Sequence, residues 1–422
     1  MNGMRSWARY NPTQYGWMLL GAVSLLCLFG VLAVHASERK LAGDGLGHAG
    51  RQIAYVGAGV VAMLVTARIG HRRLGQWSYA IYAFTLVVLA VLLADRFVDL
   101  PFVPSDVRET GARRWLRLPQ VSFVQVQPSE FAKLAYVMAL AWYLRYRKNY
   151  RRLVGLIGPF VLTIVPMVLI LLEPDLGTVV LLMPILLLML FAAGAKARHL
   201  LAVLTACVVA APLMFTCVMR DYQKMRVLGP LMQSERFRQC LQNSDRLRRL
   251  TGIKPSDIRR WDFEQGYQLI HSKIALGSGG VGGHGMLGGP YIRYSRFLPD
   301  RHNDFIFSVI GNQWGLAGTA AVLACFGIIV MVGFEVSTRT DDPFARLLAI
   351  GMVALLGVQC LFNVGMTVGL TPITGMTLPL VSFGGSSMVS SFVAIGIVIN
   401  IAQRRPPTIG HKPFEFNNRP LP

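Results

Sequence analysis

A single carboxylate stands where a long basic segment gives way to an apolar run. Asp304 lies within Pro299–Phe307 (PDRHNDFIF), and about thirty mostly apolar residues follow it. An ionisable group at a membrane boundary is costly and usually serves a site, for instance as a general base. Acids are also common in the first turn of a helix, so a helix cap by Asn303 or Asp304 is an equal alternative from position alone.

A tryptophan beside two arginines marks the edge of an earlier apolar run. Gly111–Trp115 reads GARRW, with Arg113 and Arg114 directly before Trp115. Tryptophan at a membrane edge often serves only as an interfacial anchor, which is the favoured interpretation of this motif by itself. The alternative is a sugar held on the indole face while the arginines contact phosphate.

Two acidic motifs stand at the expected starts of helices. Glu130 and Lys133 follow Pro128-Ser129 at a spacing of i, i+3, which allows an ion pair on one helix face. A structural pair is at least as good an interpretation as a role in substrate binding. Within EPDLGT (173–178), a cap of the following helix by Asp175 is favoured over the wall of a polar cavity.

Glycine and proline interrupt the second half of the chain twice. Gly369–Ser387 holds two prolines and repeated glycines, which predicts broken helices at membrane depth, where irregular backbone must be buried or line a cavity. Freed N–H groups there, with the hydroxyls of Ser382, Ser386 and Ser387, could bind an anion. Gly277–Gly289 is also dense in glycine, and a flexible linker is its favoured interpretation.

The composition identifies a membrane protein. The 422 residues are 53% hydrophobic and only 15% charged, whereas soluble domains carry about 25% charged residues. Apolar stretches long enough to cross a bilayer as helices recur throughout. We expect an all-α polytopic protein whose ten spans lie at about 15–36, 52–69, 77–95, 129–145, 153–173, 176–194, 199–218, 305–334, 346–368 and 378–402.

The short basic connections predict the orientation of these spans. With ten spans, Arg68, Arg72, Arg145, Arg198 and the other cations of short connections all fall on one side, which the positive-inside rule assigns to the cytoplasm. Both termini, including a tail at 403–422, are then cytoplasmic. Segments 96–128 and 219–304 are long extracytoplasmic loops. Within the second loop, the Arg-rich stretch 225–261 suits an amphipathic helix on lipid head groups, with Leu241, Leu247 and Leu250 on its apolar face, or equally a solvated charged helix.

The net charge bears on the choice of partners, and the cysteines bear on disulfides and metal sites. The formal net charge is +21, but no nucleic-acid-binding motif accompanies it, so membrane lipids and lipid phosphates are favoured over nucleic acid. The six cysteines show neither a disulfide framework nor the spacing of a metal site.

Taken together, these motifs resemble the SEDS family of shape, elongation, division and sporulation proteins, which includes RodA and FtsW. The matching blocks, in family order, are GARRW (111–115), QPSE (127–130), EPDLGT (173–178), GYQLIHSKIALGSGG (266–280), RHNDFIF (301–307) and GLTPITGMTLPLVSFGGSS (369–387). The resemblance covers about residues 15–402 and implies one transmembrane domain over 1–422. A RodA-like protein is favoured over an FtsW-like one.

The resemblance implies a peptidoglycan glycosyltransferase of the bacterial cytoplasmic membrane. Such enzymes polymerise lipid II, a disaccharide-peptide on undecaprenyl pyrophosphate, at the outer face, beside a class B penicillin-binding protein that crosslinks the product. It also implies that Asp304 is the catalytic acid-base residue and that Trp115 is functional. Cations expected to bind the pyrophosphates, with a divalent cation (Mg or Mn) as a helper, are Arg113, Arg114, Lys273, Arg293, Arg296 and Arg301.

The chain departs from the family pattern next to the expected catalytic residue. Asn303 stands where the family usually has Thr, and Asn312-Gln313 stands where it commonly has two Glu. The missing acids remove ligands for a cation or partners for basic groups. Two alternatives to the enzyme are a flippase for lipid-linked precursors and a non-catalytic scaffold that activates a penicillin-binding protein.

Overall fold

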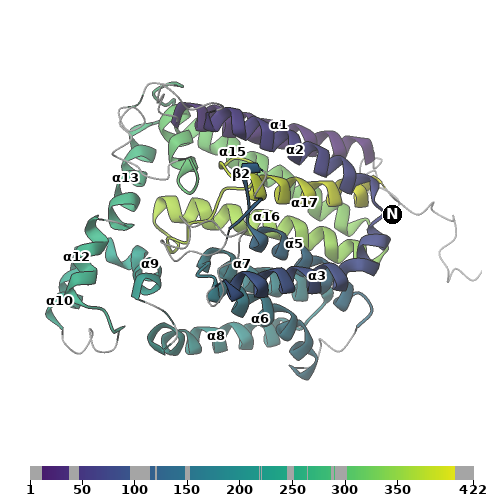
Figure 1. The fold of residues 1–422 in the computed structure, drawn as a ribbon, viewed down its shortest axis with the longest axis horizontal. Coiled ribbons are helices and arrows are strands. Elements are labelled where there is room, and N and C mark those ends of the chain that lie inside the picture. The colour runs from purple at the N-terminus through teal and green to yellow at the C-terminus, as the bar shows by residue number, and fades with distance from the viewer. Residues whose placement is uncertain are drawn as a thin grey trace, which may run out of the picture.

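The computed structural model describes residues 12–37, 47–95, 115–118, 121–147, 153–217, 219, 221–244, 251–263, 265–286, 289 and 302–403. The long helices build a bundle (Figure 1). They are α1 (Pro12–Ser37), α2 (His48–Arg68), α3 (His71–Ala94), α5 (Pro128–Leu144), α6 (Ile157–Leu172), α7 (Leu176–Ala193), α8 (Ala197–Cys217), α15 (Ile306–Thr338), α16 (Pro343–Val368) and α17 (Gly385–Gln403). Shorter elements are β1 (Leu116–Leu118), β2 (Val121–Val126), η2 (Leu153–Leu156), α9 (Asp221–Met232), α10 (Glu235–Asn243), α12 (Pro255–Phe263) and α13 (Gln265–Ser278).

The helical membrane fold expected from the sequence is confirmed. Among the described residues, nine helices are long and apolar enough to cross a membrane. The tenth expected span is α5, which has 17 residues, carries Glu130 and Lys133, and buries nearly all of its side chains among the other helices. The last span begins at Gly385, later than the expected 378, because the residues before it form irregular backbone.

The centre of the bundle depends on close approach between helices. A Cβ on Gly59 of α2 would meet the Phe392 ring of α17, and a Cβ on Gly396 of α17 would meet Thr66 and the Met63 backbone of α2. Small residues let the backbones of membrane helices approach this closely. Van der Waals packing then stabilises the contact, because lipid removes the hydrophobic driving force between helices. The result is that α17 is among the most buried helices, whereas α8 lies at the periphery with exposed apolar side chains.

The Arg-rich stretch forms a small helical cluster of its own. Helices α9, α10 and α12 gather with α13 at the end of the molecule away from the N label (Figure 1). Their shared core contains Met225, Leu241, Ile258 and Trp261. Leu241 is fully buried in this core, so the prediction that its face of α10 lies on lipid is wrong; the apolar face is satisfied inside the protein instead. Leu247 and Leu250 lie outside the described residues.

The glycine-dense segment is not a flexible linker, and that interpretation is wrong. Gly315 has φ +60° and ψ −153°, which interrupts α15, and the segment supplies hydrogen bonds at this interruption. The N–H groups of His284 and Gly285 donate to the carbonyls of Asn312 and Gln313, at 3.0 and 2.9 Å, and Leu316 N–H donates to the Gly280 carbonyl at 2.9 Å. Glycine is needed because backbone meets backbone: a Cβ on Gly283 would lie 2.1 Å from the Gln313 carbonyl oxygen.

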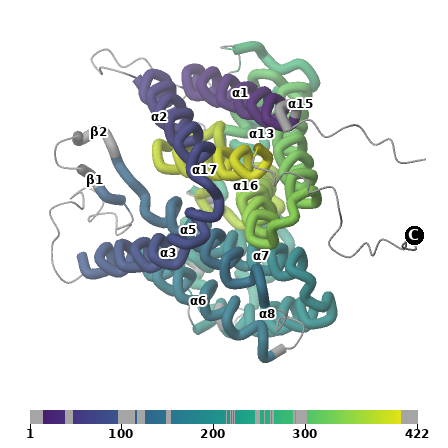
Figure 2. Tube along the Cα trace, turned by 90° about the vertical axis from the view of Figure 1, so that its right-hand side faces the viewer, coloured from purple at the N-terminus to yellow at the C-terminus, as the bar shows by residue number. Residues whose placement is uncertain are grey.

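A hairpin stands within the first loop, where no strand was expected. Strands β1 and β2 pair antiparallel, with Leu116 opposite Val126. Figure 2 shows the hairpin at the edge of the bundle, with β2 leading into α5. This connection fixes the position of Trp115, which directly precedes β1 and is half-buried.

Candidate active site

Asp304 lies in a turn at the start of α15 and is held there by its backbone. The Asn363 side chain of α16 donates to the Asp304 carbonyl at 2.9 Å and to the Met376 carbonyl at 2.6 Å. The Ser382 hydroxyl donates to the Asn303 carbonyl at 2.6 Å. Helix α15 begins at Ile306 with Phe305 at its N-cap, so neither Asn303 nor Asp304 takes the capping position of the alternative interpretation.

The segment between α16 and α17 wraps around this turn as irregular backbone. Gly375 has φ +70° and Leu380 has φ +63°, a region that residues other than glycine rarely adopt. The Leu378 N–H donates to the Ser382 hydroxyl at 2.7 Å, and the Phe383 N–H donates to the His302 carbonyl at 3.0 Å. The expected break in the helices is confirmed, and buried polar contacts hold the strained backbone in one conformation.

Two opposite charges meet at Gly375. A Cβ at this glycine would lie 3.3 Å from the Asp304 Oδ2 and 3.9 Å from an Arg226 Nη atom. Arg226 comes from α9, and its carbonyl accepts a hydrogen bond from the Ile373 N–H at 3.3 Å. Asp304 and Arg226 are both half-buried. The arrangement places a carboxylate and a guanidinium on the same small backbone surface, with no side chain of residue 375 between them.

A buried ion pair supports the irregular segment from within the bundle. Lys133 Nζ lies 2.8 Å from Glu130 Oε1 and donates to Gln359 Oε1 at 3.1 Å. Ser390 donates to the other Glu130 oxygen at 3.1 Å. Gln359 in turn donates to the Thr377 carbonyl at 2.9 Å. The predicted i, i+3 pair is confirmed, and its burial fits a role in positioning the segment; substrate binding by Glu130 and Lys133 stays a prediction.

A second polar network ties the hairpin to the same segment. The Gln127 N–H donates to the Ser386 hydroxyl at 2.9 Å, and the Gln127 amide donates to Asp175 Oδ2 at 3.0 Å. Asp175 also accepts from the Thr178 N–H at 3.3 Å, which confirms the predicted cap of α7. Trp115 directly precedes β1 of this hairpin. Gln127, which follows β2, fixes the other end of the hairpin to the start of α17.

The structure brings only some of the expected ligand groups together. The hydroxyls of Ser382 and Ser386 hold the Asp304 turn and the hairpin, and the Ser387 hydroxyl is 2.7 Å from that of Thr377. Lys273 is exposed on α13 and donates at 2.8 Å to Gln233, whose amide contacts the Gly369 carbonyl. The remaining expected cations, Arg113, Arg114, Arg293, Arg296 and Arg301, lie outside the described residues. Anion binding by all of these groups stays a prediction.

The two amides that replace family acids have packing roles. The Asn312 amide nitrogen donates to the Ala275 carbonyl at 3.2 Å and to the Ser278 hydroxyl at 2.7 Å, and the Gln313 nitrogen donates to the Met286 carbonyl at 2.7 Å. Both side chains are fully buried at the α15 interruption. They anchor the glycine-dense segment and its helix α13 to α15.

The divalent cation also stays a prediction. Across the described ranges, no group of three or more His, Cys, Asp and Glu side chains could hold a metal ion. Mg²⁺ often takes one or two carboxylates together with substrate phosphates and water. At the site described above, Asp304 is the carboxylate that could serve as such a ligand.

Sequence reasoning missed two residues of this site. Arg226 was one arginine among many in a basic stretch, and no local pattern separates it from the others; only the tertiary contact with the Gly375 segment does. Asn363 carried a signal, because a polar amide within an apolar span is rare and usually functional or structural.

Comparisons with known proteins agree with the fold and the motifs. The model of the cell cycle protein family FtsW/RodA/SpoVE matches residues 14–406. The chain is 34% identical to a probable peptidoglycan glycosyltransferase FtsW of Geobacter metallireducens, over 92% of this chain and 94% of the relative. It is 33% identical to the peptidoglycan glycosyltransferase MrdB of Escherichia coli K12, over 92% and 93% of the two chains.

Solved structures place the fold in the same group. A chain from a structure titled for the coordination of polymerization and crosslinking by a peptidoglycan synthase complex has a TM-score of 0.69, at 27% identity over 94% of this chain and 98% of that chain. The rod shape determining protein RodA of Thermus thermophilus has a TM-score of 0.59 at 23% identity, over 94% and 98%. The extent of the family match and these identities show that the chain belongs to the FtsW/RodA/SpoVE family.

Proposed function

We propose that this protein is a peptidoglycan glycosyltransferase that polymerises lipid II at the outer face of the bacterial cytoplasmic membrane, with Asp304 as the general base. The observation that carries the proposal is the fixed position of Asp304. Its turn is held by Asn363 and Ser382 from two different segments, and its carboxylate shares the Gly375 surface with the Arg226 guanidinium. The relatives named as peptidoglycan glycosyltransferases support the reaction class.

The proposed reaction is a displacement at the anomeric carbon of a lipid-linked sugar. A sugar hydroxyl loses its proton to the Asp304 carboxylate as its oxygen bonds to the anomeric carbon. The bond from that carbon to the pyrophosphate oxygen breaks, and the pyrophosphate leaves with the electron pair. Arg226 stands where positive charge would offset the growing negative charge of this leaving group. A diphosphate leaves without protonation by a second carboxylic acid, which glycoside hydrolysis requires.

The location and partner follow from the same proposal. With ten spans, the connections rich in Lys and Arg face the cytoplasm, as do both termini, and Asp304 faces outward. A class B penicillin-binding protein is the proposed partner, supported by the similarity to a chain of a peptidoglycan synthase complex. Relatives named FtsW and relatives named RodA or MrdB occur at comparable identity, so the preference for a RodA-like role stays a prediction.

The test is polymerisation of labelled lipid II by purified protein, alone and with its cognate transpeptidase. We expect Asp304→Asn to lower the yield of glycan strands by at least about a hundredfold, since general base catalysis contributes 10²–10⁴-fold. Its elution profile and melting temperature should match those of the parent protein, because the Asp304 backbone contacts are unchanged.

Two other results would redirect the assignment. Glycan ladders of equal intensity from the parent protein and Asp304→Asn would remove Asp304 from the chemistry. No ladder from either protein, under conditions where a related enzyme is active, would favour the flippase or the scaffold. Transport of lipid-linked precursor in proteoliposomes then separates these two.

A further inference from the structure

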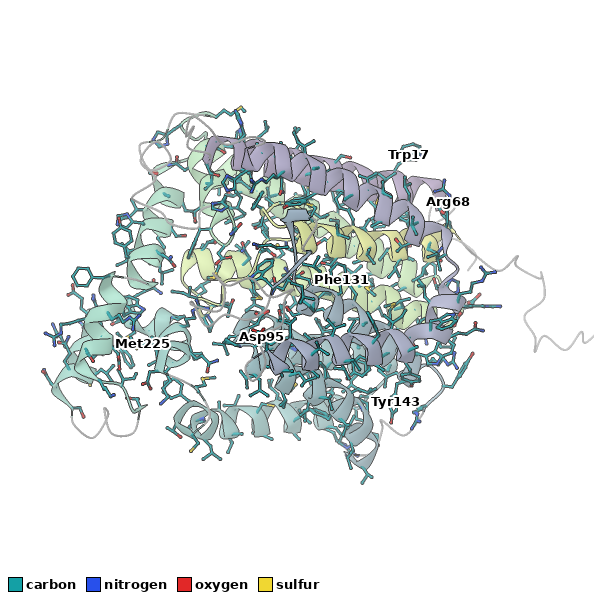
Figure 3. The ribbon with its side chains drawn as sticks, in the orientation of Figure 1. Trp17, Arg68, Asp95, Phe131, Tyr143 and Met225 are labelled. Carbon is teal, nitrogen blue, oxygen red and sulfur yellow. The ribbon has the colours of Figure 1, made fainter. Side chains whose placement is uncertain are left out.

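A large basic cavity lies at the end of the molecule opposite Asp304. It has a volume of about 1170 Å³ and is lined by the α2–α3 connection, the end of α5 and the α15–α16 connection. Asp304 precedes α15, whereas Thr340 and Asp342 of the cavity follow it, so the 33 residues of α15 lie between the two sites. Figure 3 shows Arg68 and Tyr143 towards one end and Met225 towards the other.

The cavity is lined by four arginines and two aspartates. The arginines are Arg68, Arg72, Arg73 and Arg145. Asp342 is already engaged, because it caps α16 through the Phe344 N–H at 3.0 Å and pairs with His71 Nε2 at 3.3 Å. It also lies 4.0 Å from Arg72 Nε, whose side chain is 81% exposed. The hydrogen bond from His71 lowers the pKa of Asp342. Asp342 is therefore already paired within the protein. The four arginines leave the lining of the cavity with an excess of positive charge.

One of the arginines lies against two aromatic rings. The Arg145 guanidinium carbon lies 3.0 Å from the centre of the Trp142 ring and 4.8 Å from that of Tyr146. An arginine that lies over an aromatic ring keeps its N–H donors, which can bind a phosphate. The positive-inside rule accounts for arginines in short connections, but it does not require them to line a cavity or to be held on aromatic rings.

The surface beside the cavity is suited to a lipid. Gln76 lines the cavity, and the next residue of α3, Trp77, is 65% exposed, as Tyr146 is at 73%. Exposed aromatic side chains at the end of a membrane-spanning helix suit the level of the head groups, and the exposed apolar face of α3 suits contact with acyl chains. A ligand that enters here from the membrane would present its phosphate to the arginines.

We propose that this cavity binds the phosphate head group of an anionic phospholipid, with Arg72 and Arg145 as its main ligands. Basic pockets between transmembrane helices on the cytoplasmic side are suited to such head groups. A soluble phosphate compound offers the same anionic chemistry, but the exposed apolar face beside the cavity favours the lipid. The site is independent of the reaction proposed at Asp304.

The test is photo-crosslinking of the full chain in phosphatidylcholine nanodiscs that contain a phosphatidylglycerol probe with a photoreactive head group. We expect label on peptides that span Trp142–Arg147 and His71–Gln76. The double variant Arg72→Gln/Arg145→Gln should reduce it roughly tenfold, since each basic residue near an anionic lipid contributes to binding. Lys196→Gln/Arg198→Gln removes the same charge from exposed positions outside the cavity and should leave this labelling unchanged.

Competition separates the lipid from a soluble phosphate. Excess unlabelled phosphatidylglycerol should displace the probe, while equal concentrations of glycerol 3-phosphate or inorganic phosphate should not. Displacement by the soluble phosphates would overturn the lipid assignment. Equal loss of label in the two double variants, with unchanged melting temperatures, would show attraction by net charge and overturn the site.

Discussion

At the scale of single residues, the candidate site depends on two charges that come from distant parts of the chain. Asp304 follows the outer basic segment, and Arg226 lies in α9, nearly eighty positions earlier. Both approach Gly375, which has no side chain and adopts φ +70°. Glycine serves there because a Cβ would stand 3.3 Å from the Asp304 oxygen.

Replacement of Arg226 tests whether this cation takes part in the reaction. We expect Arg226→Gln to lower the rate of lipid II polymerisation by roughly tenfold to a hundredfold, because the leaving pyrophosphate loses positive charge in the transition state. The measurement is the initial rate of glycan strand formation at saturating and limiting lipid II.

Two matched variants identify the cause of the change. Arg226→Lys keeps the charge without the planar fork and should restore part of the rate. Arg236→Gln removes a charge from an exposed position on the neighbouring helix α10 and should leave the rate unchanged. Equal loss in Arg226→Gln and Arg236→Gln would indicate general attraction of the anionic substrate to this end of the protein.

At the scale of elements, a buried pair in α5 supports the segment between α16 and α17. Lys133 is only 2% exposed and bridges Glu130 to Gln359, which holds Thr377. We expect Lys133→Met to lower the free energy of unfolding by about 3 kcal/mol or more, because Glu130 is left buried without its counter-charge. The measurement is thermal unfolding in detergent with lipid II absent.

The double variant separates structure from substrate binding. Lys133→Met/Glu130→Gln removes both charges and should recover most of the lost stability, since the uncompensated carboxylate is gone. Recovery of stability together with polymerisation assigns the pair to positioning. Recovery of stability without polymerisation would assign Glu130 or Lys133 to the substrate.

The glycine-dense segment gives a second prediction at this scale. Gly283→Ala should destabilise the protein by about 2 kcal/mol or more, because Gly283 has φ +77° and its new Cβ would collide with the Gln313 carbonyl. Gly282→Ala is the matched control, with nothing within 4 Å of its Cβ position. Equal melting temperatures for the two variants would show that the segment does not dock on α15 as described.

The whole fold was largely predictable, but its contacts at the site were not. Hydropathy located the ten long helices because each must span the same apolar layer, and local chemistry located the Asp175 cap and the Glu130–Lys133 pair. Composition could not show that Gly277–Gly289 forms backbone hydrogen bonds with α15 where that helix is interrupted. It also could not show that Leu241 and Trp261 share one buried core. These contacts join residues far apart in sequence, and a flexible linker or a lipid-bound helix has the same local pattern.

At the scale of the whole molecule, the two ends differ in their charged groups, and this difference predicts the orientation of the chain. Asp304, Arg226 and the helices α9, α10 and α12 lie at one end, while the basic connections after α2, α5 and α7 lie at the other. Short connections rich in Lys and Arg remain in the cytoplasm. The proposed reaction at the outer face requires this orientation, so a measurement of sidedness tests both together.

Native cysteines allow the measurement with few changes. Cys240 is exposed on α10 and Cys217 is exposed at the end of α8. In a Cys217→Ser background, a membrane-impermeant maleimide should label Cys240 in spheroplasts. Arg198→Cys, at an exposed position of the α8 start and in a Cys217→Ser/Cys240→Ser background, should react only after the membrane is opened. Label on Arg198→Cys in intact spheroplasts, with Cys240 protected, would invert the topology and place Asp304 in the cytoplasm, where it could not polymerise an outer-face substrate.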